Sequence, residues 1–127
     1  MITNTIQELF DRKSVRAFTD QEILPEEKEL ILKAAAAAPT AGNQQLYTIL
    51  DITDQELKDK LAETCDHQPF IAKAKMVLIF CADYQKWYDA FQAVDCESRK
   101  PGPGDLMLAC SDANIAAQNA VTAAWSL

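Results

Sequence analysis

This sequence has few of the residues that build metal sites, disulfide frameworks or nucleophilic triads. It contains one histidine, His67, which has no cysteine, aspartate or serine partner at the spacing of a metal site or a triad. Its cysteines form no C-x-x-C pair and fall in or beside expected helices and strands: Cys65, Cys81, Cys96 and Cys110. That pattern favours buried free thiols in a reducing compartment. We therefore expect no bound metal.

Glycine and long apolar runs are also scarce. Three glycines are present, and none form a G-x-G-x-x-G dinucleotide fingerprint. The longest apolar run, Met76–Ala82, is too short to cross a bilayer. The first residues, Met1–Asn4, do not resemble the start of a signal peptide. These absences predict a cytoplasmic protein that is not inserted in a membrane.

Positive charge is the minority sign. The 127 residues carry 12 Lys and Arg against 19 Asp and Glu, a net charge of −7, which argues against binding to nucleic acid or to anionic membranes. With 49% apolar and 24% charged residues, residues 1–127 are predicted to form a single globular domain.

A cationic cluster in so acidic a chain is therefore informative. The segment Arg12-Lys13-Ser14-Val15-Arg16-Ala17-Phe18 places three cations within five residues. In an extended conformation Arg12, Ser14 and Arg16 share one side. Two guanidinium forks with a hydroxyl between them suit a phosphate. The alternative is a solvated cluster favoured by the dipole at the C-terminus of the preceding helix.

A second informative stretch is Ala38-Pro39-Thr40-Ala41-Gly42-Asn43-Gln44-Gln45. Pro39 ends the preceding helix, and Gly42 permits close approach to the main chain. The hydroxyl and amide side chains offer donors and acceptors to a planar, heteroatom-rich ligand. A plain helix-to-strand connection is the alternative.

Hydrophobic periodicity predicts the remaining elements. The first predicted helix begins with a capping box at Thr5 and ends near Asp11, and a second helix is expected over 25–38, followed by a strand over 47–52. A capping box at Thr53–Glu56 opens the next helix, with Leu57 inward and Lys58 outward, and a buried central strand is expected over 76–81. An aromatic helical face follows (Tyr84, Trp87, Tyr88, Phe91), and a last helix is expected from about Leu106, capped by Asp105, with a small-residue face that can pack closely on another helix. The aromatic face is interpreted as core packing, with a substrate gate as the alternative.

The two motifs, in this order and at this separation, resemble the FMN-dependent nitroreductase family, whose patterns are R-[RK]-S-x-R-x-[FY] and A-P-[ST]-[AG]-x-N-x-Q-P. The resemblance implies that Arg12 and Ser14 hold the FMN phosphate and ribityl chain, and that Arg16, with Lys13 nearby, lies toward the pyrimidine edge of the flavin. It also implies which residues face the flavin of a partner subunit: Pro39, Thr40, Ala41, Gly42 and Asn43. Gln68 is a further flavin contact by analogy, and Trp87 and Tyr88 lie in a region that shapes the family's substrate pocket. Leu46 departs from the pattern, because the family usually has proline there.

The resemblance also implies the fold: an α+β nitroreductase-like fold, with helices packed around a small antiparallel sheet and a long central helix at a dimer interface. The sequence ends at Leu127, near the end of that helix, so we expect it to correspond to the front part of the family's domain, truncated at its C-terminus.

The function implied is that of an FMN-dependent oxidoreductase, active as a homodimer, in which NAD(P)H reduces the flavin and a small-molecule acceptor such as a nitroaromatic or quinone is then reduced. The protein would place the flavin and exclude water, without a catalytic side chain of its own. A non-catalytic flavin-binding or dimerisation module is the alternative, and a dehalogenase or flavin-fragmenting enzyme is a third reading.

Overall fold

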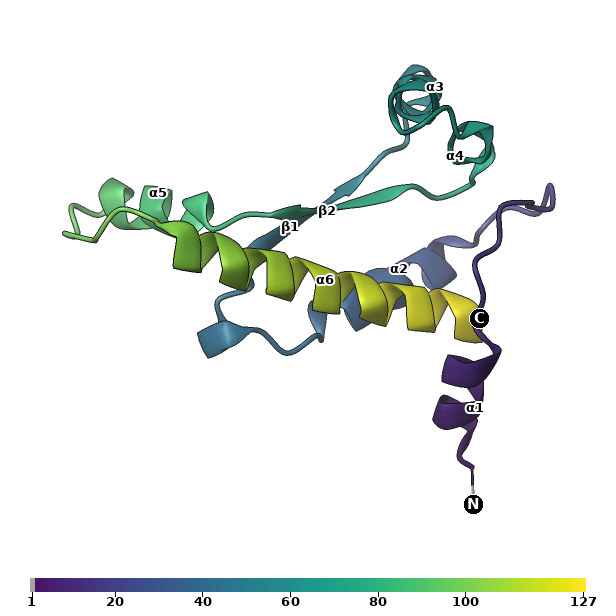
Figure 1. Ribbon diagram of the computed structural model, residues 1–127, viewed down its shortest axis with the longest axis horizontal. Helices are drawn as coiled ribbons and strands as arrows, with labels where there is room; N and C mark the ends of the chain where they lie inside the picture. The colour runs from purple at the N-terminus through teal and green to yellow at the C-terminus, as the bar shows by residue number, and fades with distance from the viewer. Residues whose placement is uncertain (1) are drawn as a thin grey trace.

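The computed structural model describes residues 2–127. Its elements, in chain order, are α1 (Asn4–Asp11), α2 (Pro25–Ala36), the 3-10 turn η1 (Ala41–Asn43), β1 (Tyr47–Asp51), α3 (Gln55–Thr64), α4 (Pro69–Lys73), β2 (Leu78–Ala82), α5 (Gln85–Ala93) and α6 (Pro103–Ser126). The long helix α6 runs along the middle of the molecule, with α2 and the two strands beside it (Figure 1). The α3–α4 pair and α5 lie at opposite ends of the strands. The predicted α+β arrangement around a small antiparallel sheet is confirmed.

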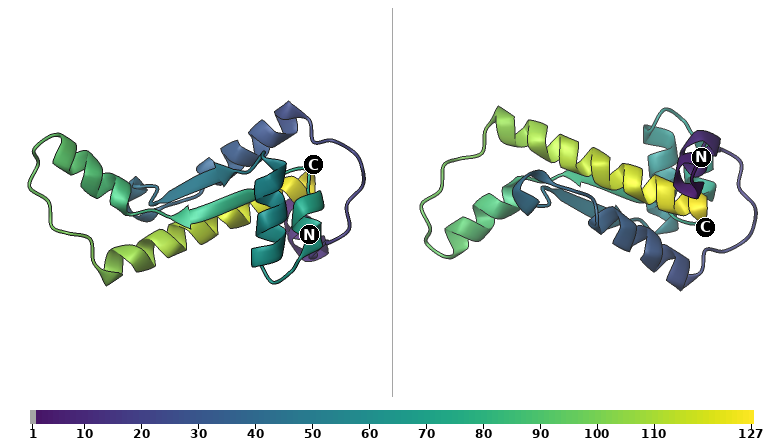
Figure 2. Two further views of the ribbon diagram at one scale, coloured as in Figure 1. Left: turned by 90° about the horizontal axis from the view of Figure 1, so that it is seen from above. Right: turned by 90° about the horizontal axis from the view of Figure 1, so that it is seen from below.

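Alanine side chains form the contact between α2 and α6. Ala35 of α2 and Ala116 of α6 are both 0% exposed, and Ile31 supplies a larger apolar group with 6% exposure. Because alanine projects only one carbon from the backbone, two helices lined with it can approach closely. The Asn119 side chain adds a polar tie by donating from Nδ2 to the Ala34 carbonyl at 3.1 Å. The small-residue face predicted for the last helix therefore has α2 as its partner, as Figure 2 shows from above and below.

The sheet packs one face on these helices. Tyr47 pairs with Ala82, Ile49 with Phe80, and the strands are antiparallel. Directly opposed residues share a face, and the Ile49–Phe80 face packs against the α2–α6 core. Within residues 2–127 the sheet has two strands, so β2 has a neighbour on one side and every one of its residues is only partly buried. The prediction of a fully buried central strand over 76–81 is wrong for this reason.

The helix caps differ from the predicted ones. Thr5 lies inside α1, whose N-cap is Thr3 and makes no side-chain cap hydrogen bond. Asp105 is the third residue of α6 rather than its cap, and it accepts a hydrogen bond from the Gly102 N–H at 2.7 Å. The Asp54 side chain caps helix α3 by accepting from the Leu57 N–H, whereas the predicted box began one residue earlier, at Thr53. Each helix still starts within a few residues of the predicted place; in α3 the Asp54 carboxylate accepts from a first-turn N–H, and in α6 Pro103 removes one of the free N–H groups.

Two side chains of α3 are reversed relative to the prediction. Lys58 is buried at 9% exposure, and its Nζ donates to the Ala74 carbonyl at 3.1 Å, whereas Leu57 is 42% exposed. The cause is α4, a short helix after Pro69 that the sequence pattern did not predict. It packs on α3, where the lysine stem can lie along apolar surface while its amino group reaches a carbonyl.

The aromatic face of α5 is not core. Trp87 and Phe91 are each 40% exposed, because α5 lies beyond the end of the sheet, away from the α2–α6 contact. The expectation of buried thiols is also wrong for three of the four cysteines, which are exposed: Cys65, Cys96 and Cys110.

Candidate functional site

The cationic segment, residues 12–18, is exposed along its whole length and adopts no regular structure. Arg12 is the C-cap of α1, which has no basic residue in its last turn. The helix dipole acts only within the last turn, so it does not account for Lys13 and Arg16. None of the ion pairs formed within residues 2–127 includes Arg12, Lys13 or Arg16. The segment therefore presents positive charge that the described chain does not neutralise.

An aromatic side chain holds this segment against α4. The Arg16 guanidinium lies 5.7 Å from the centroid of the Phe70 ring, and the Phe18 ring meets the same ring edge-on at 6.3 Å. Gln68, two residues before Phe70, is the N-cap of α4, and its Nε2 donates to the Cys65 carbonyl at 2.9 Å. Gln68 therefore lies at the start of the short helix whose Phe70 contacts the cationic segment, and its expected contact with a flavin stays a prediction. No sequence pattern indicated the role of Phe70.

The 40–46 loop, from Thr40 to Leu46, is tightly folded. Gly42, Asn43 and Gln45 all have left-handed backbone angles, with φ of 58°, 56° and 47°. Thr40 Oγ1 accepts from the Gln45 N–H at 3.2 Å, and Gln45 Nε2 donates to Asn43 Oδ1. Several of the hydrogen-bonding groups expected to face a ligand are therefore used to shape the loop itself. Gly42 and Asn43 remain exposed, and Pro39 is exposed just before the loop.

A buried carboxylate ties this loop to α6. Asp112 is 2% exposed; its Oδ1 accepts from the Ala41 N–H at 3.1 Å and its Oδ2 accepts from the Leu46 N–H at 3.2 Å. Hydrogen bonds to a charged group contribute about 1.5–3 kcal/mol each. Burial, and after it the charge of Asp112, raise the pKa of the Tyr47 phenol. Sequence reasoning missed Asp112, although a single acid in the alanine-lined face of α6 was a visible signal.

The departure at Leu46 is accommodated by hydrogen bonds on both sides of the residue. Its N–H donates to Asp112, and its carbonyl accepts from the Asp83 N–H at 2.9 Å. The side chain is 4% exposed. The loop therefore leaves toward β1 in a fixed direction without the proline of the family pattern.

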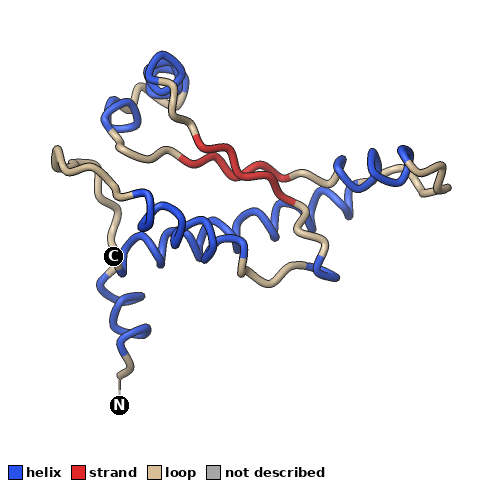
Figure 3. Tube along the Cα trace, turned by 180° about the vertical axis from the view of Figure 1, so that it is seen from behind, coloured by secondary structure: helices blue, strands red, loops and turns tan. Residues whose placement is uncertain are grey.

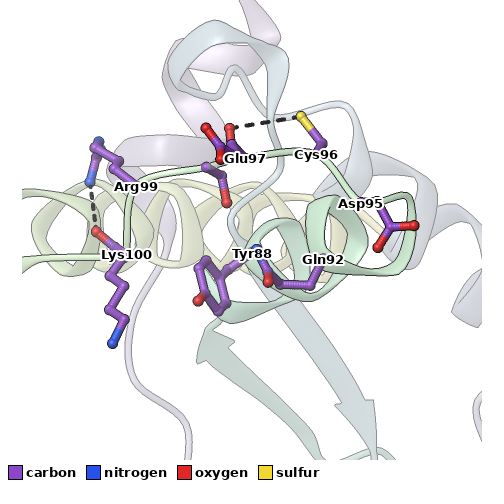
Figure 4. A pocket seen from close by; sticks show the side chains of 8 residues that line it. Tyr88, Gln92, Asp95, Cys96, Glu97, Arg99 and Lys100 are labelled. Atoms are coloured by element: carbon purple, nitrogen blue, oxygen red, sulfur yellow. Dashed lines mark hydrogen bonds between the residues drawn. The ribbon is translucent and has the colours of Figure 1, made fainter.

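Helix α5 lies beside the same loop. Trp87 Nε1 donates to the Gln44 carbonyl at 2.7 Å. A hollow between the loop and α5 is lined by Leu46 from the loop and by Tyr88 and other side chains from α5. Figure 4 shows the adjoining pocket, where Tyr88 and Gln92 lie below the segment 95–100. The aromatic face thus lines hollows next to the loop, which is the position that the gate interpretation requires.

The two predicted binding motifs do not meet within one chain. The cationic segment lies near the C-terminal end of α6, whereas η1 and the 40–46 loop lie farther along that helix on its other side (Figure 1). The view from behind in Figure 3 shows the same separation. The two motifs of one chain therefore lie at different places along α6.

Comparison with known proteins identifies the family. Residues 9–127 match the model of the Nitroreductase family. The chain is 34% identical over 128 residues to FMN reductase (NADPH) of Bacillus subtilis, a match that covers 99% of this chain and 51% of that protein. It is 32% identical over 124 residues to the oxygen-insensitive NADPH nitroreductase of Salmonella typhimurium, covering 97% and 50%. The chain belongs to the Nitroreductase family. Among solved structures of this family, NfrA2 of B. megaterium superimposes with a TM-score of 0.92 at 31% identity, covering 98% of this chain and 51% of that one.

The chain spans about half the length of the curated relatives it matches. Among residues 2–127, no group of three or more histidine, cysteine or acidic side chains is placed to hold a metal ion. No helix in this part of the chain is long and apolar enough to cross a membrane.

The exposed motifs fit the FMN that a nitroreductase resemblance implies. FMN has a phosphate that requires cationic donors, and the cationic segment offers such donors without carboxylate partners in the described chain. Its planar ring requires close approach to the main chain, and Gly42 is exposed and has no side chain to obstruct it. Both requirements are met by groups that the fold leaves accessible.

Proposed function

We propose that this chain supplies cofactor-binding residues to an FMN-dependent, NAD(P)H-driven oxidoreductase of the nitroreductase type. The observation that carries the proposal is the cationic segment. Its cations are exposed and lack ion-pair partners within residues 2–127, in a chain whose net charge is −7. Such a segment creates a local positive potential that attracts an anionic ligand.

The residues divide the work by their chemistry. Arg12 and Ser14 bind the phosphate and the ribityl chain, since a guanidinium fork and a hydroxyl both donate to phosphate oxygens. Arg16, held over the Phe70 ring, and Lys13 lie toward the polar edge of the flavin. Flavin, when bound, supplies the hydride chemistry, and no nucleophilic side chain is required.

The loop residues act across a subunit boundary in this proposal. Because the two motifs lie apart in one chain, the residues from Pro39 to Asn43 complete the site of a second copy, and the functional unit is a homodimer. Exposed apolar side chains on α6, among them Leu108, Ile115 and Val121, supply surface for such an association. The acceptor is a small electron-poor molecule such as a nitroaromatic or a quinone. NAD(P)H as reductant and unpaired cysteines both suit the cytoplasm.

The absorption spectrum of the purified protein after incubation with FMN and desalting tests the binding step. We expect the unaltered protein to retain a flavin spectrum. We expect Arg16→Ala to weaken the binding free energy of FMN by about 1.5–3 kcal/mol, because it removes one charge-assisted contact. Lys60→Ala, at an exposed position on α3, is the matched control and should leave the affinity unchanged. Unchanged affinity in Arg16→Ala would refute the site assignment.

NAD(P)H oxidation with a quinone or nitroaromatic acceptor tests turnover in the same preparation. Flavin retention with oxidation of NAD(P)H supports the oxidoreductase. Flavin retention without oxidation would instead favour a flavin-binding module that lacks turnover.

A further inference from the structure

Asp112 is the buried ionisable side chain that the proposed binding roles leave unexplained. It lies on α6 in a face otherwise formed by small apolar residues, with 2% exposure. Burying a carboxylate is costly unless its oxygens receive hydrogen bonds. Both oxygens of Asp112 do receive one, and both donors are main-chain N–H groups of the 40–46 loop, at its two ends.

The loop between those two donors adopts a conformation that the chain does not favour by itself. Asn43 and Gln45, neither of them glycine, hold left-handed angles, as Gly42 does between the donors at Ala41 and Leu46. In the left-handed region, residues other than glycine have a higher conformational energy, and such conformations persist only where the surrounding structure holds them. Clamping both ends of the loop on one rigid helix is a means of holding it.

The residue at position 46 supplies the second donor of the clamp. Proline, which the family pattern has at this position, carries no N–H and could not donate to Asp112. Leu46 does donate, at 3.2 Å. A carboxylate is an acceptor only, with two oxygens, so it can serve the Ala41 and Leu46 donors at once. An amide at position 112 has one oxygen and would turn its NH2 group toward one of the two donors.

We propose that Asp112 is a positioning residue that fixes the 40–46 loop in its left-handed conformation and thereby sets the affinity of the site that the loop completes. This inference rests on the proposed function for its second half only. The first half concerns the folded chain without any cofactor.

Amide hydrogen exchange of the full chain without flavin, followed by NMR, tests the first half. In the unaltered protein the Ala41 and Leu46 amide protons should exchange at least roughly tenfold more slowly than in an unstructured chain, and in Asp112→Asn they should exchange roughly 10- to 100-fold faster than in the unaltered protein. Asn119→Ala is the matched control. It removes another polar tie from the same helix, to Ala34 rather than to the loop, and should leave loop exchange within about twofold.

Flavin titration of the same variants tests the second half, with FMN as the probe. Asp112→Asn should raise the FMN Kd about tenfold or more, whereas Asn119→Ala should change it by less than about threefold. Faster loop exchange with an unchanged FMN Kd would overturn the link between Asp112 and the site.

The remaining outcomes separate this inference from the proposed function. Unprotected Ala41 and Leu46 amides in the unaltered chain would overturn the positioning role even if Asp112→Asn failed to fold. Loop exchange that is the same in Asp112→Asn as in the unaltered chain would overturn it too. If the unaltered chain binds no FMN while Asp112→Asn accelerates loop exchange, the proposed function fails and the loop-fixing role of Asp112 stands.

Discussion

Replacing Ile31 by alanine tests the core on which every other feature depends. Ile31 is the larger apolar side chain at the contact between α2 and α6, with 6% exposure, and it belongs to the buried cluster that includes Ala35 and Ala120. The other buried members of that cluster are alanines, which are too small to fill the space that the substitution would leave. A cavity is therefore expected to remain between the two helices.

The magnitude follows from what is removed. Ile→Ala deletes about three methyl or methylene groups, each worth about 0.8 kcal/mol on burial, and the residual cavity adds to this cost. We expect the free energy of unfolding to fall by about 2–4 kcal/mol. A domain of this size loses roughly 3–6 °C in Tm for each kcal/mol, so the melting temperature should drop by roughly 6–24 °C.

Urea denaturation followed by circular dichroism measures this loss, at several protein concentrations so that any association is visible. Leu30→Ala is the matched control, because it deletes a side chain of similar size from the adjacent position on α2, where Leu30 is 53% exposed. That variant should lose less than about 1 kcal/mol. A loss below about 1 kcal/mol for Ile31→Ala, or equal losses for the two variants, would refute this account of the core.

Three further predictions concern polar and aromatic contacts. Hydrogen bonds from Arg99, and after them one from the Gly102 N–H, lower the pKa of Asp105 from 3.8 to about 2. Because the pKa of Asp105 is lower in the folded than in the unfolded chain, the ionised carboxylate stabilises the fold fully above pH 3.8, and this stabilisation is lost as the pH falls toward 2. Asp105→Asn should flatten that part of a curve of unfolding free energy against pH measured with urea, and an unchanged curve would contradict the assignment. Lys58→Met keeps the apolar stem but leaves the half-buried Ala74 carbonyl without its charged donor, so it should lower the free energy of unfolding by about 1–3 kcal/mol in urea denaturation, whereas a neutral result would mean that water replaces the lysine. Phe70→Leu removes the ring beneath the Arg16 guanidinium, a contact worth about 0.5–1 kcal/mol at an exposed site, and should lower the backbone NMR order parameters of the cationic segment; unchanged order parameters there would show that the ring does not hold the segment.

Local sequence patterns were sufficient for most of the elements. Proline at position 25, the apolar periodicity of 25–36 and the alternation after Tyr47 gave helices and strands close to those observed. The errors occurred where distant residues decide burial. Lys58 is buried because α4 packs on α3, and α5 is exposed because it lies beyond the sheet. Neither relation is visible in the periodicity of the segment itself.

The candidate site divides in the same way. The cationic segment and the stretch from Ala38 to Gln45 were singled out from residue types and spacing, and the family resemblance then implied their binding roles, which stay predictions. Their separation along α6, the contact of Phe70 with Arg16 and the clamp by Asp112 were not predicted. These contacts join residues more than fifty positions apart in the chain.

The sequence by itself determined the kind of chemistry this chain offers: a cluster of cations in an acidic protein, a glycine-containing loop of hydrogen-bonding groups, and a long helix with an alanine face. Those properties belong to side chains and to short-range periodicity. The tertiary structure alone decided which groups are brought together and which are kept apart. Packing of α2 and the sheet on α6 places Asp112 beneath the loop and carries the cationic segment to a different place along that helix, because long-range contacts fix the relative positions of elements that local preferences leave undetermined.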